Sequence, residues 1–344
     1  MEDALWSDCI PSDILELISS RLVAVEYFIF RAVCKRWRYT PMTPPRRPAQ
    51  PEKSPCLITL RGDTGIVDFF HPVYNVMTTT SISILKLMDS RIRSSKANWL
   101  LISHGSHNMF FFNPISNDII ELPDLQEEYE NICVWTFSCP PDSSSSACFV
   151  VGFDYLGNPP DVCIIKVGET NWTPIFFKNN IVYVLGDKGN LGILTINENS
   201  IPSWKFYGKS FLRRRLNSIQ YVYMAEDVDN EGMLAVFLSH HEGKVEVWRY
   251  KMNGEVLERE KITSLDNKTL FVSLEGSCLK TCVAQGLGNK IYFSMFHNNN
   301  GVFYCLANRK YYSFDYLGIK AYSSSNIFNL VRPTSCIWIE SEND

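Results

Sequence analysis

The sequence predicts an α+β chain in two parts: a small all-α region at the N-terminus and a large all-β region, a propeller, after it. Three observations predict this division. None of the 18 glycines lies before Gly62, and five of the 17 prolines lie between Pro41 and Pro51. Beyond the prolines, short apolar runs alternate with turn residues. We therefore expect a helical domain at 1–40, a proline-rich linker at 41–54 and a β domain at 55–344.

Composition limits the class of protein. The chain has 344 residues, 45% of them hydrophobic and 20% charged, which suits a folded core. Its net charge of −4 makes a nucleic-acid partner unexpected. There is neither an apolar run of about 18 residues nor an apolar leader after the acidic start, so we expect no membrane span and no secretory signal. Eleven scattered cysteines without a C-x-x-C pair are typical of reduced thiols, some of them buried (Cys148, Cys163, Cys305), in a cytoplasmic or nuclear protein.

Residues 11–22 predict the first helix. Pro11 suits the first turn, and Asp13 suits the positive end of the helix dipole. Helical spacing places Ile14, Leu15 and Ile18 on one apolar face, which Leu22 extends, with Leu17 beside it.

Residues 25–38 predict a second helix that is unusually rich in large apolar side chains. Val33, Cys34 and Trp37 continue its apolar stripe, and basic residues occupy the other face. About 40 residues cannot bury so much apolar surface alone. The helices must therefore pack on the body or on another chain, and the proline-rich linker, an extended spacer by composition, favours another chain.

The order and spacing from Ile10 to Trp37, preceded by Trp6, resemble an F-box. This resemblance implies binding to the Skp-type adaptor of Skp–cullin–F-box (SCF) ubiquitin ligases. The adaptor-binding residues that it implies are Ile10, Pro11, Ile14, Leu15, Ile18, Leu22, Val33, Cys34 and Trp37. One departure is that Pro41, Pro44 and Pro45 follow at once where a further helical turn is usual, since proline breaks a helix. A degenerate F-box that assembles no ligase is therefore the alternative.

The body predicts repeated β-hairpins. The apolar runs at 99–102, 109–112, 148–151, 181–185, 234–238 and 302–306 are short and rich in β-branched or aromatic residues. Asn253-Gly254 and Asn300-Gly301 are strong turn signals. Repeats of 40–45 residues over about 290 residues predict a propeller of about six or seven four-stranded blades.

A second resemblance supports the propeller. Residues 99–102, 111–116 and 120–123 are similar, in order, to a segment of plant F-box proteins with a KIB-type β-propeller. Residues 171–174, 181–185, 245–250 and 288–293 also fit that family. The chain departs from it by having Asn117 where the family has glycine after Ser116. The resemblance implies that the propeller binds a target protein.

Candidate sites for chemistry are weak. Two candidate metal pairs lack a well-spaced third ligand: His104 with His107, which nearby turn residues place in a loop, and Cys278 with Cys282. No nucleophile elbow is present and no complete phosphate loop. We therefore expect no metal, no cofactor and no enzyme activity. The sequence predicts a non-catalytic substrate-recognition subunit of an SCF E3 ubiquitin ligase, with the alternative of an interaction protein whose F-box is degenerate.

Overall fold

The structure is a computed structural model, and it describes the chain in segments. They are residues 10–19, 30, 36–37, 54–73, 75–79, 84–126, 132–142, 148–154, 161–169, 180–185, 189, 191–196, 203–207, 219–230, 232–239, 243–254, 256–282, 287–315, 318–322, 330 and 335–340. Residues 41–53 of the predicted linker lie outside these segments, so the predicted domain boundaries stay predictions.

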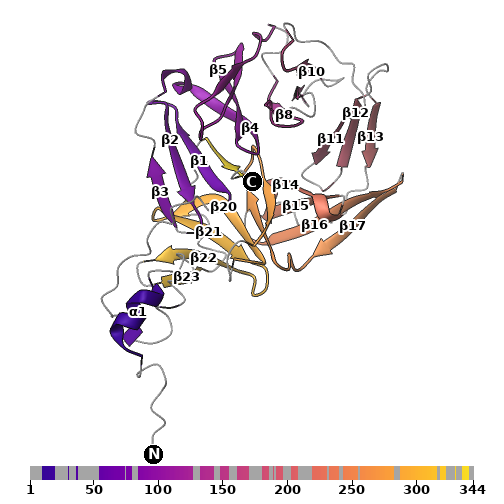
Figure 1. Ribbon diagram of the computed structural model, residues 1–344. Helices are drawn as coiled ribbons and strands as arrows, with labels where there is room; N and C mark the ends of the chain where they lie inside the picture. The colour runs from indigo at the N-terminus through magenta and orange to yellow at the C-terminus, as the bar shows by residue number, and fades with distance from the viewer. Residues whose placement is uncertain are drawn as a thin grey trace, which may run out of the picture.

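One α-helix near the N-terminus and a series of strands make up the described part, as the sequence predicts. Helix α1 spans Ser12–Ser19 and lies outside the ring formed by the sheets (Figure 1). Of the second predicted helix, 25–38, only Phe30, Arg36 and Trp37 are among the described residues, and these three are helical. Two short 3-10 turns, η2 (Leu85–Leu87) and η5 (Val228–Asn230), are also described. None of the described helices is long and apolar enough to cross a membrane.

The first half of the ring consists of three antiparallel sheets, arranged with the others around a common centre (Figure 1). Sheet A has the order β24-β1-β2-β3, sheet B the order β4-β5-β6-β7 and sheet C the order β10-β9-β8. Their strands are β1 (Cys56–Arg61), β2 (Ile66–His71), β3 (Val76–Thr79), β4 (Ser90–Lys96), β5 (Trp99–His104), β6 (Asn108–Phe112), β7 (Ile119–Glu121), β8 (Val134–Phe137), β9 (Phe149–Asp154), β10 (Asp161–Lys166) and β24 (Cys336–Ile339).

The second half consists of sheets D, E and F. Sheet D has the order β11-β12-β13, sheet E the order β14-β15-β16-β17 and sheet F the order β19-β18-β20-β21-β22-β23. Their strands are β11 (Asn180–Leu185), β12 (Leu191–Ile196), β13 (Ser203–Tyr207), β14 (Ile219–Asp227), β15 (Gly232–Ser239), β16 (Val245–Asn253), β17 (Val256–Ile262), β18 (Lys268–Val272), β19 (Cys278–Thr281), β20 (Lys290–His297), β21 (Asn300–Cys305), β22 (Lys310–Asp315) and β23 (Gly318–Tyr322).

Buried apolar clusters join five pairs of neighbouring sheets: A with B, B with C, D with E, E with F, and F with A. The ring closes between the two ends of the body, because β24 pairs antiparallel with β1, from Cys56↔Ile339 to Thr59↔Cys336. Trp338 of β24 then packs at 5.0 Å from Phe271 of sheet F, between ring centroids. A propeller is therefore confirmed as the fold of the body.

The predicted number and regularity of the blades are wrong. Among the described strands, sheets A, B and E have four strands, sheets C and D have three and sheet F has six. The propeller has five blades rather than six or seven, so its six described sheets do not each correspond to one four-stranded blade. Sheet F departs most, because β18 pairs antiparallel with its neighbour β19 on one side and parallel with β20 on the other. Such long-range pairing leaves no local signal in a sequence.

The two predicted hairpin turns have different outcomes. Asn253 pairs with Val256 around Gly254, whose φ is 60°, so this turn is confirmed. Asn300 and Gly301 instead belong to β21, and the turn lies two residues earlier at Asn298 and Asn299, which have φ of 48° and 65°. Asparagine tolerates the left-handed region better than most residues, which makes this shift possible.

Gly301 is required by packing rather than by a turn. A Cβ atom there would lie 2.4 Å from Cζ of Phe70, which fills the space above the strand.

The backbone conformation of Asn117 explains how it can replace the glycine of the family pattern. Its φ is 63°, a conformation that glycine adopts freely and that asparagine adopts best among the other residues.

We expect Gly152→Ala to destabilise the propeller by about 1–3 kcal/mol, because overpacking a filled core has that cost. The added Cβ would lie 2.6 Å from the ring of Trp135 and 2.9 Å from Sγ of Cys163. Urea unfolding of the variant measures the change. Gly62→Ala is the matched control, since its Cβ meets nothing within 4 Å; an equal effect in both variants would contradict the packing argument.

Candidate partner-binding site

The first helix divides its apolar residues between two faces. Leu15 is fully buried, whereas Ile14, Leu17 and Ile18 are 43%, 50% and 37% exposed. The exposed three are spaced i, i+3 and i+4, so they share one side of α1. The helix begins where the carbonyl of Pro11 accepts a hydrogen bond from the amide of Leu15, at 3.1 Å. We call Ile14, Leu17 and Ile18 the exposed stripe.

A small core holds this helix in place. Leu15 packs with Phe30 and Trp37, both buried, and Ile10 packs against this group. The rings of Phe30 and Trp37 lie 4.5 Å apart between centroids. Nη2 of Arg36 donates a hydrogen bond to the carbonyl of Ile10 at 2.8 Å. These contacts fix α1 against residues from the second predicted helix and leave the exposed stripe pointing away from that core.

The predicted adaptor-binding residues therefore fall into three groups. Ile14 and Ile18 are available on the surface, with Pro11 also exposed beside them. Leu15 and Trp37 lie inside the small core and Ile10 is half-buried at its edge. The remaining three, Leu22, Val33 and Cys34, lie outside the described residues. Leu17, placed beside the face in the sequence analysis, is the most exposed of the stripe; its i+3 spacing from Ile14 is the signal for it.

The candidate metal residues have other roles. Nδ1 of His104 lies 3.0 Å from the carbonyl of Met88 and 3.2 Å from Oγ of Ser90, and Nδ1 of His107 lies 3.2 Å from the carbonyl of Leu125. In the described segments no group of three His, Cys, Asp or Glu side chains could hold a metal ion. Both histidines thus tie a strand end or turn to a neighbouring loop.

The cysteines follow the sequence analysis in two of three positions. Cys148 and Cys163 are buried, and burial raises the pKa of each thiol to about 12. Cys305, expected to be buried, is only half-buried. Every cysteine within the described segments is a free thiol. Cys278 and Cys282 are both half-buried and pack against the core between sheets A and F.

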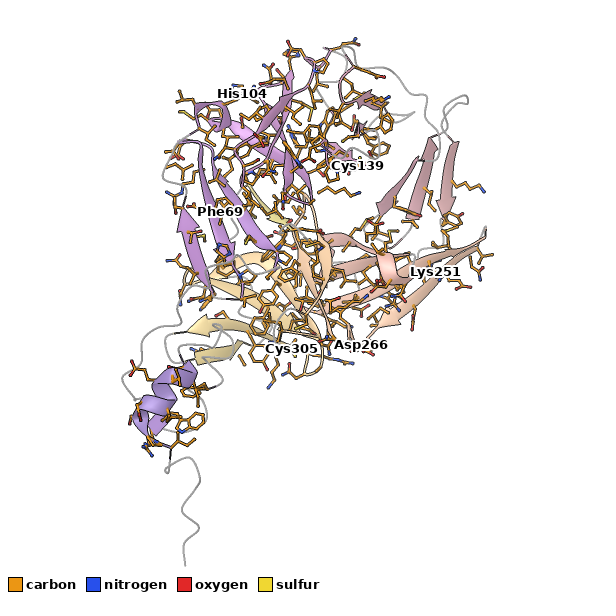
Figure 2. The ribbon with its side chains drawn as sticks, in the orientation of Figure 1. Phe69, His104, Cys139, Lys251, Asp266 and Cys305 are labelled. Carbon is orange, nitrogen blue, oxygen red and sulfur yellow. The ribbon has the colours of Figure 1, made fainter. Side chains whose placement is uncertain are left out.

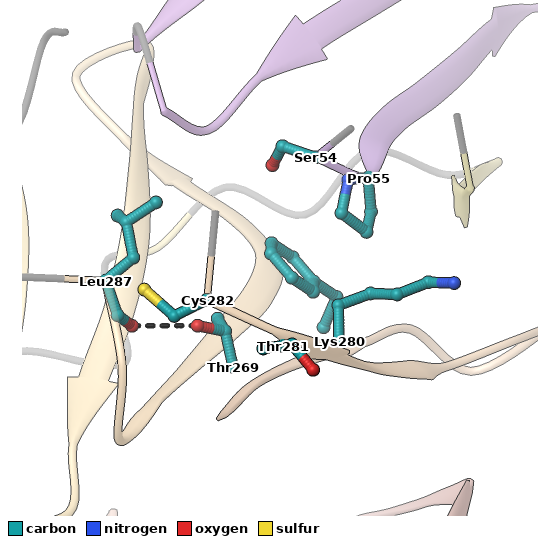
Figure 3. A pocket seen from close by; sticks show the side chains of 8 residues that line it. Ser54, Pro55, Thr269, Lys280, Thr281, Cys282 and Leu287 are labelled. Carbon is teal, nitrogen blue, oxygen red and sulfur yellow. Dashed lines mark hydrogen bonds between the residues drawn. The ribbon is translucent and has the colours of Figure 1, made fainter. Parts of the chain in front are cut away.

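A small hollow lies where the body begins, between sheets A and F (Figure 3). Ser54 and Pro55 form one side, and Thr269, Phe271 and Cys282 form the other. Oγ1 of Thr269 donates a hydrogen bond to the carbonyl of Leu287 at 2.8 Å. The space takes about one water-sized group. This size suits a water molecule beside the buried hydroxyl of Ser54 and is too small for an organic substrate.

Sheet E carries a network of charges. Both carboxylate oxygens of Asp227, whose side chain is 1% exposed, accept hydrogen bonds: from Asn230 at 2.9 Å and from Arg249 at 2.9 Å. Lys268 lies 3.6 Å from the same carboxylate. Burial alone would raise the pKa of Asp227, but the hydrogen bonds from Asn230 and Arg249 and the two positive charges outweigh it, so the pKa is lowered.

Glu246 is a second buried carboxylate of the same sheet. Its pKa is also lowered, because hydrogen bonds from Lys261 and Lys244 outweigh the effect of burial. The two ammonium groups lie 2.9 and 3.0 Å from Oε1. These arrangements neutralise charge within the sheet, and they provide neither a nucleophile nor an open cleft. The ion pairs of Asp227 and Glu246 therefore stabilise the propeller.

Comparisons with known proteins match both parts of the chain. A model of the KIB1-4 beta-propeller family matches residues 69–317, and the F-box domain model matches residues 7–46. The F-box protein At4g00893 of Arabidopsis thaliana is 28% identical over 312 residues, covering 84% of this chain and 76% of that protein. The F-box/kelch-repeat protein At3g18720 of the same plant is 24% identical over 315 residues, covering 84% and 80%.

Among solved structures, an oligogalacturonate lyase from Vibrio parahaemolyticus aligns with a TM-score of 0.35 and 9% identity, over 76% of this chain and 80% of that one. This likeness is too low to carry an argument about fold or activity. The family match, in contrast, covers well over half of the chain and agrees with the ring of sheets and with the apolar N-terminal helix. The chain therefore belongs to the plant F-box proteins that carry a KIB-type β-propeller.

Proposed function

We propose that the chain is a non-catalytic substrate-recognition subunit of an SCF E3 ubiquitin ligase. The F-box binds a Skp-type adaptor and, through it, a cullin. The propeller binds a target protein. The subunit would then act by raising the effective concentration of the target beside the ubiquitin donor, without side-chain chemistry of its own. The cytoplasm or the nucleus is the expected location.

One observation carries this proposal: the exposed stripe on α1. Three large aliphatic side chains of this eight-residue helix are exposed, whereas the neighbouring Leu15 is fully buried. Fully burying such side chains stabilises a complex by about 1.5–3 kcal/mol each. An amphipathic helix that leaves this much apolar surface uncovered fits a groove or helix pair on a partner.

The test is co-purification of the full chain with a plant Skp-type adaptor, followed by addition of a cullin. We expect a stable complex at micromolar concentrations. If the wild-type chain binds no adaptor at those concentrations, the ligase function is wrong and the alternative, an interaction protein with a degenerate F-box, is supported. Pro41, Pro44 and Pro45, which lie within the F-box match, are the sequence feature behind that alternative.

A further inference from the structure

Strand β4 contains a bulge at an arginine. Ile92 pairs with Ile102 and Ser94 with Leu101, so Arg93 is an extra residue without an opposite partner. Bulges commonly redirect a side chain at a functional position. β4 is the inner strand of sheet B, and it packs beside β24 on one side and β8 on the other (Figure 1). The bulge therefore lies on the inner part of the ring, at the junction of sheets B and C.

The bulge brings both arginines beside Ser103. Nε of Arg93 donates a hydrogen bond of 2.7 Å to Oγ of Ser103, and Ser103 is the residue opposite Arg91 in the strand register. Arg91 is exposed and Arg93 is half-buried. Burial and the neighbouring charge of Arg91 both lower the pKa of Arg93, and the nearby group that acts against them is the thiol of Cys133.

Neither arginine has an ion pair with a carboxylate in the described part of the chain. This contrasts with other partly buried cations of the propeller. Arg249, 26% exposed, forms ion pairs with Asp227 and Glu260. Lys268, 25% exposed, forms ion pairs with Asp227 and Asp229. Lys280, 24% exposed, forms one with Glu340. Lys290, which is also half-buried, lies over the ring of Phe303 at 4.5 Å instead. Within the described residues Arg91 and Arg93 have neither a carboxylate nor an aromatic ring against them, so their charge is left for a ligand.

We propose that Arg91 and Arg93 form a binding site for a phosphorylated side chain of a target protein, which rests on the proposed function of the propeller as the target-binding domain. Two uncompensated positive charges match a phosphoryl group, which carries about −1.5 to −2 charges, better than a single carboxylate. Guanidinium groups bind such oxygens through paired hydrogen bonds. Val134, 46% exposed, follows Cys133 on β8 and supplies an apolar contact for the adjoining peptide.

The test uses the full chain and four probes: a short glycine-serine peptide with one phosphoserine, the same peptide with serine, the same peptide with glutamate, and inorganic phosphate. Isothermal titration measures each dissociation constant. We expect the phosphoserine peptide to bind most tightly. Arg91→Gln combined with Arg93→Gln should weaken it at least about tenfold, because hydrogen bonds to a charged group are lost at both positions. Lys251→Gln, an exposed cation on sheet E far from β4, is the control and should leave binding unchanged (Figure 2).

Three results would overturn the inference: equal binding by wild type and the double variant, equal binding of the glutamate peptide, or inorganic phosphate binding as tightly as the phosphopeptide. The last would indicate a site for free phosphate. Arg91→Gln alone guards against misfolding, since Arg91 has no ion pair within the described segments, and it should still weaken binding. Adaptor co-purification is measured on the same variants and should persist. If the wild type binds the phosphopeptide but no adaptor, only the proposed ligase function is refuted.

Discussion

Leu17→Arg combined with Ile18→Arg should abolish co-purification with the Skp-type adaptor while leaving the chain folded. Both side chains belong to the exposed stripe, so the substitutions remove apolar contact without opening a cavity. The adaptor would bury both side chains in the complex. Losing this burial, at about 1.5–3 kcal/mol for each side chain, weakens binding by at least about a hundredfold. Arginine is a good helix former, so α1 itself should persist. Pull-down and titration with purified adaptor measure the loss.

Glu16→Arg is the matched control for the same helix. It adds the same charge on a different exposed face of α1, away from the stripe. We expect adaptor binding close to that of the wild type. If Glu16→Arg and the double variant lose binding equally, the effect comes from charge or from helix loss, and the exposed stripe is not the contact surface.

Leu15→Ala and Trp37→Ala address a different question. These side chains form the small core with Phe30, so their truncation costs about 2–5 kcal/mol in a segment that has little other core. Adaptor binding should fall because α1 loses its support. Circular dichroism separates the two classes: helix content decreases in the core variants and is retained in the stripe variant.

This division of α1 could not be predicted from the sequence. Helical spacing places Ile14, Leu15 and Ile18 on one broad apolar face, and it does not say which partner covers each residue. The answer depends on Phe30 and Trp37, which lie 15 and 22 residues beyond Leu15 in the sequence. Periodicity therefore predicts the helix and its apolar character, whereas tertiary packing decides which side chains remain for a partner.

The propeller shows the same limit. The turn at Gly254 is encoded by two adjacent residues and was predictable, because a tight hairpin requires its own local chemistry. The pairing of β24 with β1 joins residues nearly 280 positions apart, and the parallel pairing of β18 with β20 passes over β19. Neither leaves a local pattern. Arg93 was missed for a related reason, since its bulge is visible only from the register of two strands.

Asp227→Ala should destabilise the propeller by about 3–5 kcal/mol, the usual cost of removing one partner of a buried ion pair. Asp227 connects β14 through Arg249 to β16 and through Lys268 to β18, so it links sheets E and F. Its loss leaves two partly buried cations with only the exposed carboxylates of Glu260 and Asp229. Urea unfolding of the full chain measures the difference.

Asp229→Asn is the control for this prediction. Its carboxylate is 70% exposed and pairs with the same Lys268, at 2.5 Å. Exposed ion pairs contribute about 0–1 kcal/mol, so the free energy of unfolding should change little. A similar loss in both variants would show that burial of Asp227 is not what makes its ion pairs important.

The pH dependence tests whether the charge of Asp227 is the cause. Because its pKa is lowered in the folded protein, the charged form stabilises the fold above the pKa of the unfolded chain, about 3.9, and this contribution is lost as pH falls through the lower folded value. Asp227→Asn lacks the charge at every pH. The difference in unfolding free energy between wild type and Asp227→Asn should therefore be largest near neutral pH and should shrink below about pH 4. A difference that stays constant down to pH 3 would attribute the effect to shape and hydrogen bonding rather than to charge, and the network on sheet E would then be a packing feature of the propeller.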